Sequence, residues 1–361
     1  MRKDYFFYAL ALVLSISVIL IADFLLSKTF VQNKHCYKYS EYFYELKKNC
    51  EGKFRFKKSF PLISIYTDEM GLRVGKNKIK KNLNKENIFI FGDSFTYGVG
   101  LEYEKTFVGL IEKKLDKYNH FNFGVGSYSP SVYVHKLNEA LNSGKKPSKI
   151  IVFLDLSDVI NESARWRFDE NTKIAQLQTN DLYNLVKEKK DDFSESNFKI
   201  LENIFSLINY NLRLLRSKIT NITSKNDKIK TSIQGSFTYT SQDNLDKKFW
   251  KKNTFETGIA NIEKRFDDLK EMSNNHKFHI HLVVYPWAET LEFGQKKFNW
   301  SEFSKKLCNH DRCHLIDAIS EFSKYKLNNK NWATDLYFLN DEHFNEKGAK
   351  LLSEIVISKI K

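Results

Sequence analysis

The sequence predicts an α/β protein, a three-layer α/β/α sandwich around a central parallel sheet. Two observations predict it. From Asn87 onward, strand and helix patterns alternate along the chain, and such alternation is typical of a parallel sheet with right-handed crossovers. The predicted strands at 87–91 and 149–156 are also almost continuously apolar, as strands buried on both faces of a sheet are.

The first predicted element is an N-terminal membrane anchor. Residues 5–22 carry no charge, and the apolar character continues after Asp23 as far as Leu26. A helix of this length spans roughly 27–33 Å, which matches the hydrocarbon core of a bilayer. A cleaved signal peptide is the alternative, but its apolar region is usually shorter. We therefore expect residues 1–26 to anchor the chain in the inner (cytoplasmic) membrane through residues 5–26, with the remainder in the periplasm.

The second element is a juxtamembrane segment at residues 27–84. It contains the first two of the four cysteines, Cys36 and Cys50, while Cys308 and Cys313 lie near the C-terminus. Two local pairs favour disulfides in an oxidising compartment, most simply Cys36–Cys50 and Cys308–Cys313. A zinc site and free thiols are the alternatives, although no Cys-x-x-Cys motif is present.

The remaining elements belong to one predicted domain, residues 85–361. After the strand at 87–91 the patterns predict a helix at 104–118, a strand at 120–124, a helix at 131–142 and a strand at 149–156. A polar stretch at 163–252, with one amphipathic helix near 198–219, is interpreted as an inserted cap. The alternation then resumes with a helix at 256–273, a strand at 278–286, a helix at 301–308, a weak strand at 313–317 and a last helix at 345–360.

The net charge of +14 raises the question of nucleic-acid binding. The basic residues are spread along the whole chain, without a helix-turn-helix signal, a zinc-finger spacing or one dense basic cluster. A nucleic-acid-binding protein usually concentrates its charge on one face or motif. We therefore expect no nucleic-acid partner.

The turn after the first strand carries the candidate nucleophile, Ser94, in "FGDSFTYG" (91–98). A serine attacks an ester when a histidine takes its proton and a carboxylate orients that histidine. Of nine histidines, only His343, in "DEHFNEKG" (341–348), stands beside acids at the start of the C-terminal helix, with Asp341 two residues before it. A plain helix cap is the alternative for Asp93 and Ser94, and we expect Asp93 itself to be structural.

These two segments resemble the first and last sequence blocks of the GDSL/SGNH hydrolases. The Asp-x-His spacing of Asp341 and His343 is similar to that of the polysaccharide O-acetylation branch. The resemblance implies the flavodoxin-like SGNH fold, with Ser94 as nucleophile, His343 as general base and Asp341 as the residue that orients it. It also implies that no metal and no organic cofactor is needed.

The two middle blocks of that family are matched with changes. "NFGVGSYSP" (122–130) resembles the second block with Ser127 in place of its last glycine, and "FLDLSDVINE" (153–162) resembles the third block with Ser157 in place of its asparagine. The resemblance implies that the backbone N–H groups of Ser94 and Ser127 stabilise the oxyanion, with the Ser157 hydroxyl as a helper. Loss of one well-placed donor costs about 2.7–4 kcal/mol of transition-state stabilisation.

Aromatic residues suggest where a sugar could bind. Trp287 follows a predicted core strand, and Tyr128 lies in the second block. We assign both to substrate binding because aromatic faces stack on sugar rings, with ordinary packing as the alternative. His279 and His281, which alternate on one predicted strand, could form a metal site, but we interpret them as packing residues.

The expected function is serine-dependent hydrolysis of an acyl ester, or O-acyl (acetyl) transfer, on extracytoplasmic carbohydrate through an acyl-enzyme. The expected partners are an acylated carbohydrate or another acyl ester and, for transfer, a membrane protein that donates the acyl group. The alternative is a non-catalytic carbohydrate-binding or scaffolding protein of the same fold, which the changes at Ser127 and Ser157 favour. Contact between Ser94 and His343 would discriminate between them.

Overall fold

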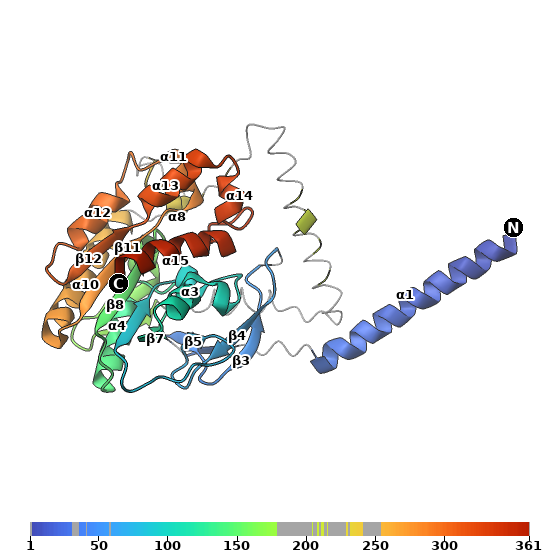
Figure 1. Ribbon diagram of the computed structural model, residues 1–361, viewed down its shortest axis with the longest axis horizontal. Helices are drawn as coiled ribbons and strands as arrows, with labels where there is room; N and C mark the ends of the chain where they lie inside the picture. Colours follow the sequence, from blue (N-terminus) through green and yellow to red (C-terminus); the bar gives the residue numbers. More distant parts are fainter. Residues whose placement is uncertain are drawn as a thin grey trace.

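The computed structural model describes residues 2–30, 36–40, 42–57, 59–178, 232–240 and 254–360, together with the single positions 204, 208, 211, 212, 215 and 229. Its centre is a five-stranded sheet with helices on both sides (Figure 1). The α/β class and the central parallel sheet that the sequence predicts are thereby confirmed.

The central sheet has the strand order β12–β11–β8–β6–β7, and each neighbouring pair is parallel. Among the strands of this sheet, β6 comes first in the sequence. The next strand, β7, pairs with one side of β6, and β8 pairs with the other side. Such a reversal opens a crevice at the carboxyl ends of the strands, where parallel sheets bind their ligands. The strands are β6 (Asn87–Phe91), β7 (Asn119–Asn122), β8 (Lys149–Leu154), β11 (His279–Val284) and β12 (Cys313–Asp317).

The apolar strands are buried as their sequences predict. Side chains of β6 and β8 such as Phe89, Phe91, Ile151 and Phe153 are 0 % exposed. The predicted weak strand at 313–317 is β12, which lies at one edge of the sheet, and the Cys308–Cys313 disulfide connects it to the end of the preceding helix. Hydrophobic packing on both faces therefore fixes the central strands, as expected for a sheet between two helix layers.

Helices cover the sheet in two groups (Figure 1). In one, α15 packs against α3; in the other, α10 packs against α4 and α5. The helix predicted at 104–118 is divided into a 3₁₀ turn, η1, and α3. The bounds are α2 (Ser94–Tyr97), η1 (Tyr103–Lys105), α3 (Phe107–Lys114), α4 (Pro130–Asn142), α5 (Asp158–Ile160), α10 (Thr254–His276), α11 (Ala288–Phe293), α12 (Trp300–Leu307), α13 (Ile319–Asn328), α14 (Trp332–Leu336) and α15 (Glu346–Ile360).

The predicted juxtamembrane segment contains small antiparallel sheets. We call the described residues 36–40, 42–57 and 59–75 the N-terminal module. It consists of a hairpin, β1 (Tyr37–Tyr39) and β2 (Tyr44–Leu46), and a three-stranded sheet, β3 (Glu51–Phe54), β4 (Ile63–Thr67) and β5 (Arg73–Val74). The predicted Cys36–Cys50 disulfide is present in it.

The N-terminal module packs on the α/β domain. Buried Arg73 donates to the carbonyl oxygens of Gly98 and Leu101 at 3.0 and 2.6 Å, and Tyr44 donates its hydroxyl to Gly126 O at 2.7 Å. A buried guanidinium needs several acceptors, and the turn that follows α2 supplies them. The N-terminal module therefore stabilises, through these hydrogen bonds, the loop after α2 and the loop that contains Gly126.

Residues of the predicted anchor form helix α1 (Arg2–Phe30), and many of its apolar side chains are exposed, including Leu12, Val13 and Val18. Among the helices of the described residues, none combines the length and the apolar character that crossing a membrane requires. The anchor expected at residues 5–26 stays a prediction.

The described part of the predicted cap begins with a π-helical turn. This turn, η2 (Asn161–Arg165), leads into a hairpin of β9 (Trp166–Asp169) and β10 (Ile174–Leu177), and a short helix, α8 (Ile233–Ser236), follows later in the chain. The amphipathic helix predicted near 198–219 lies outside the described residues except for single positions.

Candidate active site

Ser94 lies where β6 ends and α2 begins, at the carboxyl edge of the sheet. Asp93 caps the helix, because its Oδ1 accepts a hydrogen bond from Phe95 N at 2.9 Å, as a short polar side chain does at this position. Gly98 ends α2 with a φ of +83°. A Cβ on Gly92 would lie 2.0 Å from Thr96 Oγ1, so the turn requires glycine there.

The loop before α15 brings His343 to Ser94. Tyr337 and Phe344 pair across the base of this loop, and Asn345 Nδ2 donates to the carbonyls of Thr334 and Tyr337, each at 3.0 Å. His343 Nε2 then lies 2.8 Å from Ser94 Oγ, within hydrogen-bond distance. The loop is therefore closed by its own backbone and fixes the imidazole over the end of β6.

Asp341 completes a triad. Its Oδ1 lies 2.5 Å from His343 Nδ1 and also accepts from the His343 backbone N–H at 3.1 Å. With the Nδ1 proton donated to Asp341, Nε2 is left to accept the proton of Ser94, which is the tautomer that a general base requires. The structure thus brings together Ser94, His343 and Asp341, which the sequence motifs predicted from opposite ends of the domain.

Burial and charge set the protonation of this pair. Burial lowers the pKa of His343, but the hydrogen bond and the negative charge of Asp341 outweigh burial, so the pKa is raised above 6.5. Burial raises the pKa of Asp341, but hydrogen bonds from His343 and Lys57 and their positive charges hold it well below its usual range. Asp341 is therefore an ionised partner for the imidazolium that forms when Ser94 is deprotonated.

Two residues at the site come from the N-terminal module. Lys57 Nζ lies 2.5 Å from Asp341 Oδ2, and the ring of Phe56 meets the imidazole of His343 edge-on, with centroids 5.2 Å apart. Neither residue was predicted, because 284 residues separate Lys57 from Asp341 and no motif surrounds Lys57.

The predicted oxyanion donors lie beside Ser94. A Cβ on Gly126 would lie 3.9 Å from Ser94 Cβ, so the 126–128 turn is next to the nucleophile. Tyr44 binds Gly126 O, and Trp166 Nε1 donates to Ser127 O at 2.8 Å. Within the described part of the chain, the backbone N–H groups of Ser94 and Ser127 donate to no protein acceptor. Both are therefore available to a substrate oxygen.

Ser127 has a left-handed backbone, with φ at +59°. This conformation is costly for a residue with a Cβ and is typical of functional turns. The family's glycine at this position is therefore explained by geometry, and serine is accommodated with some strain.

Ser157 also reaches the site, but its hydroxyl has another partner. It lies in the turn after β8 and donates to Asp93 Oδ2 at 3.4 Å, the oxygen that lies 3.1 Å from Ser94 Oγ. Its role as an oxyanion donor remains a prediction.

Behind Ser94 lies a group of buried carboxyl groups. Asp93, Asp155 and Asp158 are at most 2 % exposed. Burial, together with the charge of Asp155, raises the pKa of Asp93 to about 7. Asp155 Oδ1 accepts from Ser157 N at 2.7 Å and its Oδ2 accepts from Trp287 Nε1 at 2.6 Å.

The prediction that two aromatic residues bind substrate is wrong, because both side chains are buried. Trp287 and Tyr128 are each 2 % exposed. Trp287 donates to Asp155, and the Tyr128 hydroxyl donates to Tyr44 O at 2.6 Å. Neither ring offers a face on which a sugar could stack, so both act as packing residues that support the loops around the site.

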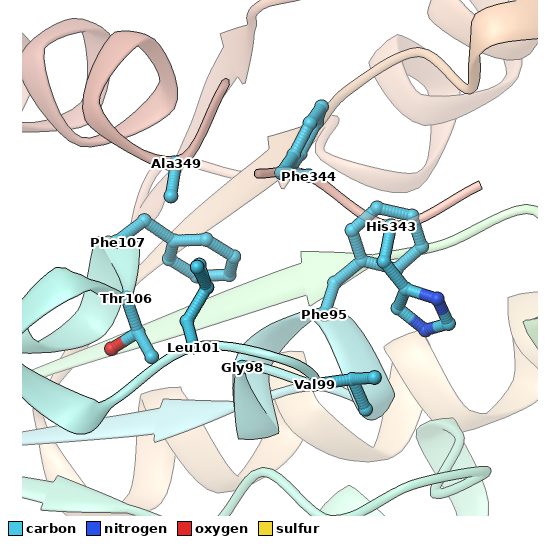
Figure 2. Close-up of a pocket in the computed structure, with 9 residues that line it drawn as sticks. All are labelled: Phe95, Gly98, Val99, Leu101, Thr106, Phe107, His343, Phe344 and Ala349. Atoms are coloured by element: carbon cyan, nitrogen blue, oxygen red, sulfur yellow. The ribbon is translucent and has the colours of Figure 1, made fainter. Parts of the chain in front are cut away.

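A cavity of about 10 Å³ lies beside His343 and is shown in Figure 2. Figure 2 shows the imidazole of His343 pointing away from Phe107 and Ala349, and Ser94 does not line the cavity. A space of this size holds about one water molecule. It is a packing gap behind the triad, and an acyl chain would not enter it. Its lining residues are Phe95, Gly98, Val99, Leu101, Thr106, Phe107, His343, Phe344 and Ala349.

Two groups of side chains resemble metal sites. Asp341, Glu342 and His343 place three potential ligand atoms within 4.8 Å of one another, but Asp341 and His343 Nδ1 are engaged with each other in the triad. The other group is on β11 and β12, where His279 Nδ1 lies 3.0 Å from His314 Nε2. A hydrogen bond between these two rings accounts for that contact, and the packing role of His279 and His281 stays a prediction.

Comparison with known proteins finds similarity in fold. No protein-family model matches this chain, and no curated protein matches it in sequence. A lipolytic protein of the G-D-S-L family from Veillonella parvula is 10% identical with a TM-score of 0.42, over 76% of this chain and 98% of that chain. A catalytic mutant of an acetylxylan esterase from Geobacillus stearothermophilus is 11% identical with a TM-score of 0.41, over 78% of this chain and 96% of that chain.

A third solved structure, that of TesA, is 11% identical with a TM-score of 0.42, over 76% of this chain and 98% of that chain. These similar structures include G-D-S-L lipolytic proteins and acetylxylan esterases, the class that the motifs around Ser94 and His343 resemble. With TM-scores below 0.5 and identities of 10–11%, this likeness is one of fold and not of chemistry, since one fold hosts many functions.

Proposed function

We propose that the protein is a serine-dependent acyl-ester enzyme. The observation that carries the proposal is the continuous contact from Ser94 Oγ to His343 Nε2 at 2.8 Å and from His343 Nδ1 to Asp341 Oδ1 at 2.5 Å. Sequence motifs 249 residues apart meet in the order that nucleophilic catalysis requires. A fold that only binds carbohydrate has no physical need for this arrangement.

In the proposed reaction, Ser94 Oγ forms a bond with the carbonyl carbon of the ester while its proton passes to His343 Nε2. The carbonyl oxygen becomes an oxyanion, which the N–H groups of Ser94 and Ser127 stabilise. The bond to the leaving alcohol then breaks, and the alcohol takes the proton from His343. The acyl group remains on Ser94 until water or a sugar hydroxyl, deprotonated by His343, takes it.

The choice between hydrolysis and transfer depends on which acceptor reaches the acyl-enzyme. We propose O-acetyl transfer or hydrolysis on carbohydrate, and this part rests on the Asp-x-His spacing of Asp341 and His343, which resembles the O-acetylation branch. Two disulfides, Cys36–Cys50 and Cys308–Cys313, support a location outside the cytoplasm. A membrane anchor at residues 5–26 and a membrane protein as acyl donor remain proposals from the sequence and its family resemblance.

The first test measures turnover of p-nitrophenyl acetate by the full-length chain. Replacement of either Ser94 or His343 by Ala should reduce kcat at least about 10³-fold, because neither the nucleophile nor its base has a substitute. Ser358→Ala, an exposed serine on α15, is the matched control and should retain wild-type turnover. Wild-type turnover in Ser94→Ala would overturn the proposal.

Two further measurements sharpen the substrate class. Mass spectrometry of the enzyme trapped with substrate should show an added acetyl group on Ser94 and none in Ser94→Ala. Adding an oligosaccharide acceptor then separates the two outcomes, since a transferase acetylates the sugar while a hydrolase releases acetate at an unchanged rate.

A further inference from the structure

Several carboxyl groups lie around His343. Its imidazole faces carboxyl groups from three elements, and the group consists of Asp341 and Glu342 of its own loop, Asp93 at the start of α2 and Asp155 after β8. Nearby negative charge favours imidazolium over neutral imidazole. Imidazolium cannot take the proton of Ser94, so an acidic surrounding works against a general base at neutral pH.

Lys57 is the cation placed against this group. Its Nζ lies 2.5 Å from Asp341 Oδ2, while the other oxygen of that carboxylate binds His343 Nδ1. One carboxylate therefore joins the ammonium to the imidazole. Among the described residues, no other Lys or Arg forms an ion pair with Asp341, Glu342 or Asp93.

Lys57 is held in place by its own segment. Its Nζ lies 4.8 Å from the ring centroid of Phe56 and 6.0 Å from that of Phe60, and aromatic faces attract such a cation. Phe56 contacts His343, while Phe60 packs on Phe338 with centroids 4.6 Å apart. The aromatic rings that position Lys57 are thus packed against the loop that carries Asp341 and His343.

We propose that Lys57 is a positioning residue of the triad: it fixes Asp341 and increases the fraction of His343 that is unprotonated, and therefore able to act as base, at neutral pH. This inference rests on the proposed function. It also assigns a role to the N-terminal module, which supplies the cation that the loop between α14 and α15 lacks.

The test is the pH dependence of kcat/KM for acetyl ester hydrolysis. Replacing Lys57 by Met keeps the apolar stem and removes the charge. The midpoint of the acidic limb should then move to higher pH by about half a unit to one unit, the size expected for one partly solvated charge a few ångströms away. Lys57→Arg should restore the wild-type midpoint. The control is Lys53→Met, which removes the same charge from an exposed position on β3 and should leave the midpoint unchanged.

A merely structural role gives a different result. If Lys57 only supported the fold, Lys57→Met would lower kcat/KM equally at every pH with an unchanged midpoint, and this outcome would overturn the inference. So would a profile that superimposes on that of the wild type. Thermal unfolding of each variant confirms that the folded protein is compared.

A second readout needs no turnover. The imidazole resonance of His343, assigned by its loss in His343→Gln, gives the pKa directly by NMR titration. Lys57→Met should raise that pKa by the same amount as it moves the kinetic midpoint. If the wild type proves inactive on every ester, the proposed function fails while this titration still decides the role of Lys57.

Discussion

Ser94 lies between two acidic regions whose carboxyl groups have shifted pKa values of opposite direction. On the histidine side, the loop of residues 338–345 holds Asp341 against His343 and Lys57, and those partners keep its pKa well below the usual range. On the turn side, Asp93 is buried near Asp155, and burial raises its pKa to about 7. The same chemical group is thus an anion on one side and about half protonated at pH 7 on the other.

The difference comes from partners, because both regions are buried. Asp341 is 6 % exposed and Asp93 is 2 % exposed, but Asp341 pairs directly with His343 and Lys57, whereas Asp93 lies near the like charge of Asp155. Environments that push two carboxyl pKa values apart are a mark of divided chemical roles. The Asp341 carboxylate stabilises a charged imidazole, while the Asp93 carboxyl group fixes the turn that carries Ser94.

The largest effect should come from the histidine side. Asp341→Asn removes the acceptor that fixes the Nδ1–H tautomer of His343, so kcat should fall by about 10³–10⁴-fold with the fold intact. Steady-state kinetics on an acetyl ester measures this loss. Glu342→Gln is the matched control, since that carboxylate lies 4.0 Å from His343 Nδ1, and it should cost less than about tenfold. A loss below tenfold in Asp341→Asn would remove Asp341 from the triad.

The sequence motifs predicted the histidine side well and the turn side poorly. Ser94, Asp341 and His343 were predicted because nucleophilic catalysis restricts residue type and spacing, and the apolar strands predicted the sheet that brings them together. Lys57 and Arg73 were not predicted, since single contacts over long sequence separations leave no local pattern. Trp287 was misassigned, because sequence shows an aromatic residue in a loop but not whether its indole is buried.

On the turn side, the expected effect is on stability. The folded protein binds the Asp93 proton more tightly than the unfolded chain, whose pKa is near 3.8. The contribution of Asp93 to stability is therefore greatest below about pH 4, and it falls by about 1.4 kcal/mol per pH unit towards pH 7. Asp93→Asn keeps an oxygen for Phe95 N and cannot ionise, so its free energy of unfolding should lack this decline.

Denaturant unfolding at pH 5 and pH 8 measures the effect. The difference in unfolding free energy between Asp93→Asn and wild type should shift in favour of the variant from pH 5 to pH 8. Exposed Asp311 provides the control, and Asp311→Asn should show no such shift. An equal difference at both pH values would mean that Asp93 is ionised throughout, and the contrast with Asp341 would disappear.

The smallest effect concerns the oxyanion turn on the same side. Ser127 has φ at +59°, a conformation that costs a residue with a Cβ about 1 kcal/mol and glycine almost nothing. Ser127→Gly should therefore change stability by between about 0 and +1 kcal/mol, since the added freedom of the unfolded glycine offsets part of the relief. Urea denaturation measures this change.

Ser127→Ala keeps the strain and removes only the hydroxyl, so the pair of variants separates backbone from side-chain donation. Both retain the backbone N–H, which has no protein acceptor in the described part of the chain. If that N–H alone stabilises the oxyanion, both variants keep kcat within about threefold, because no donor is lost. A tenfold loss in both would instead assign the donation to the serine hydroxyl, and the turn side would then contribute chemistry through a side chain that the family's glycine does not have.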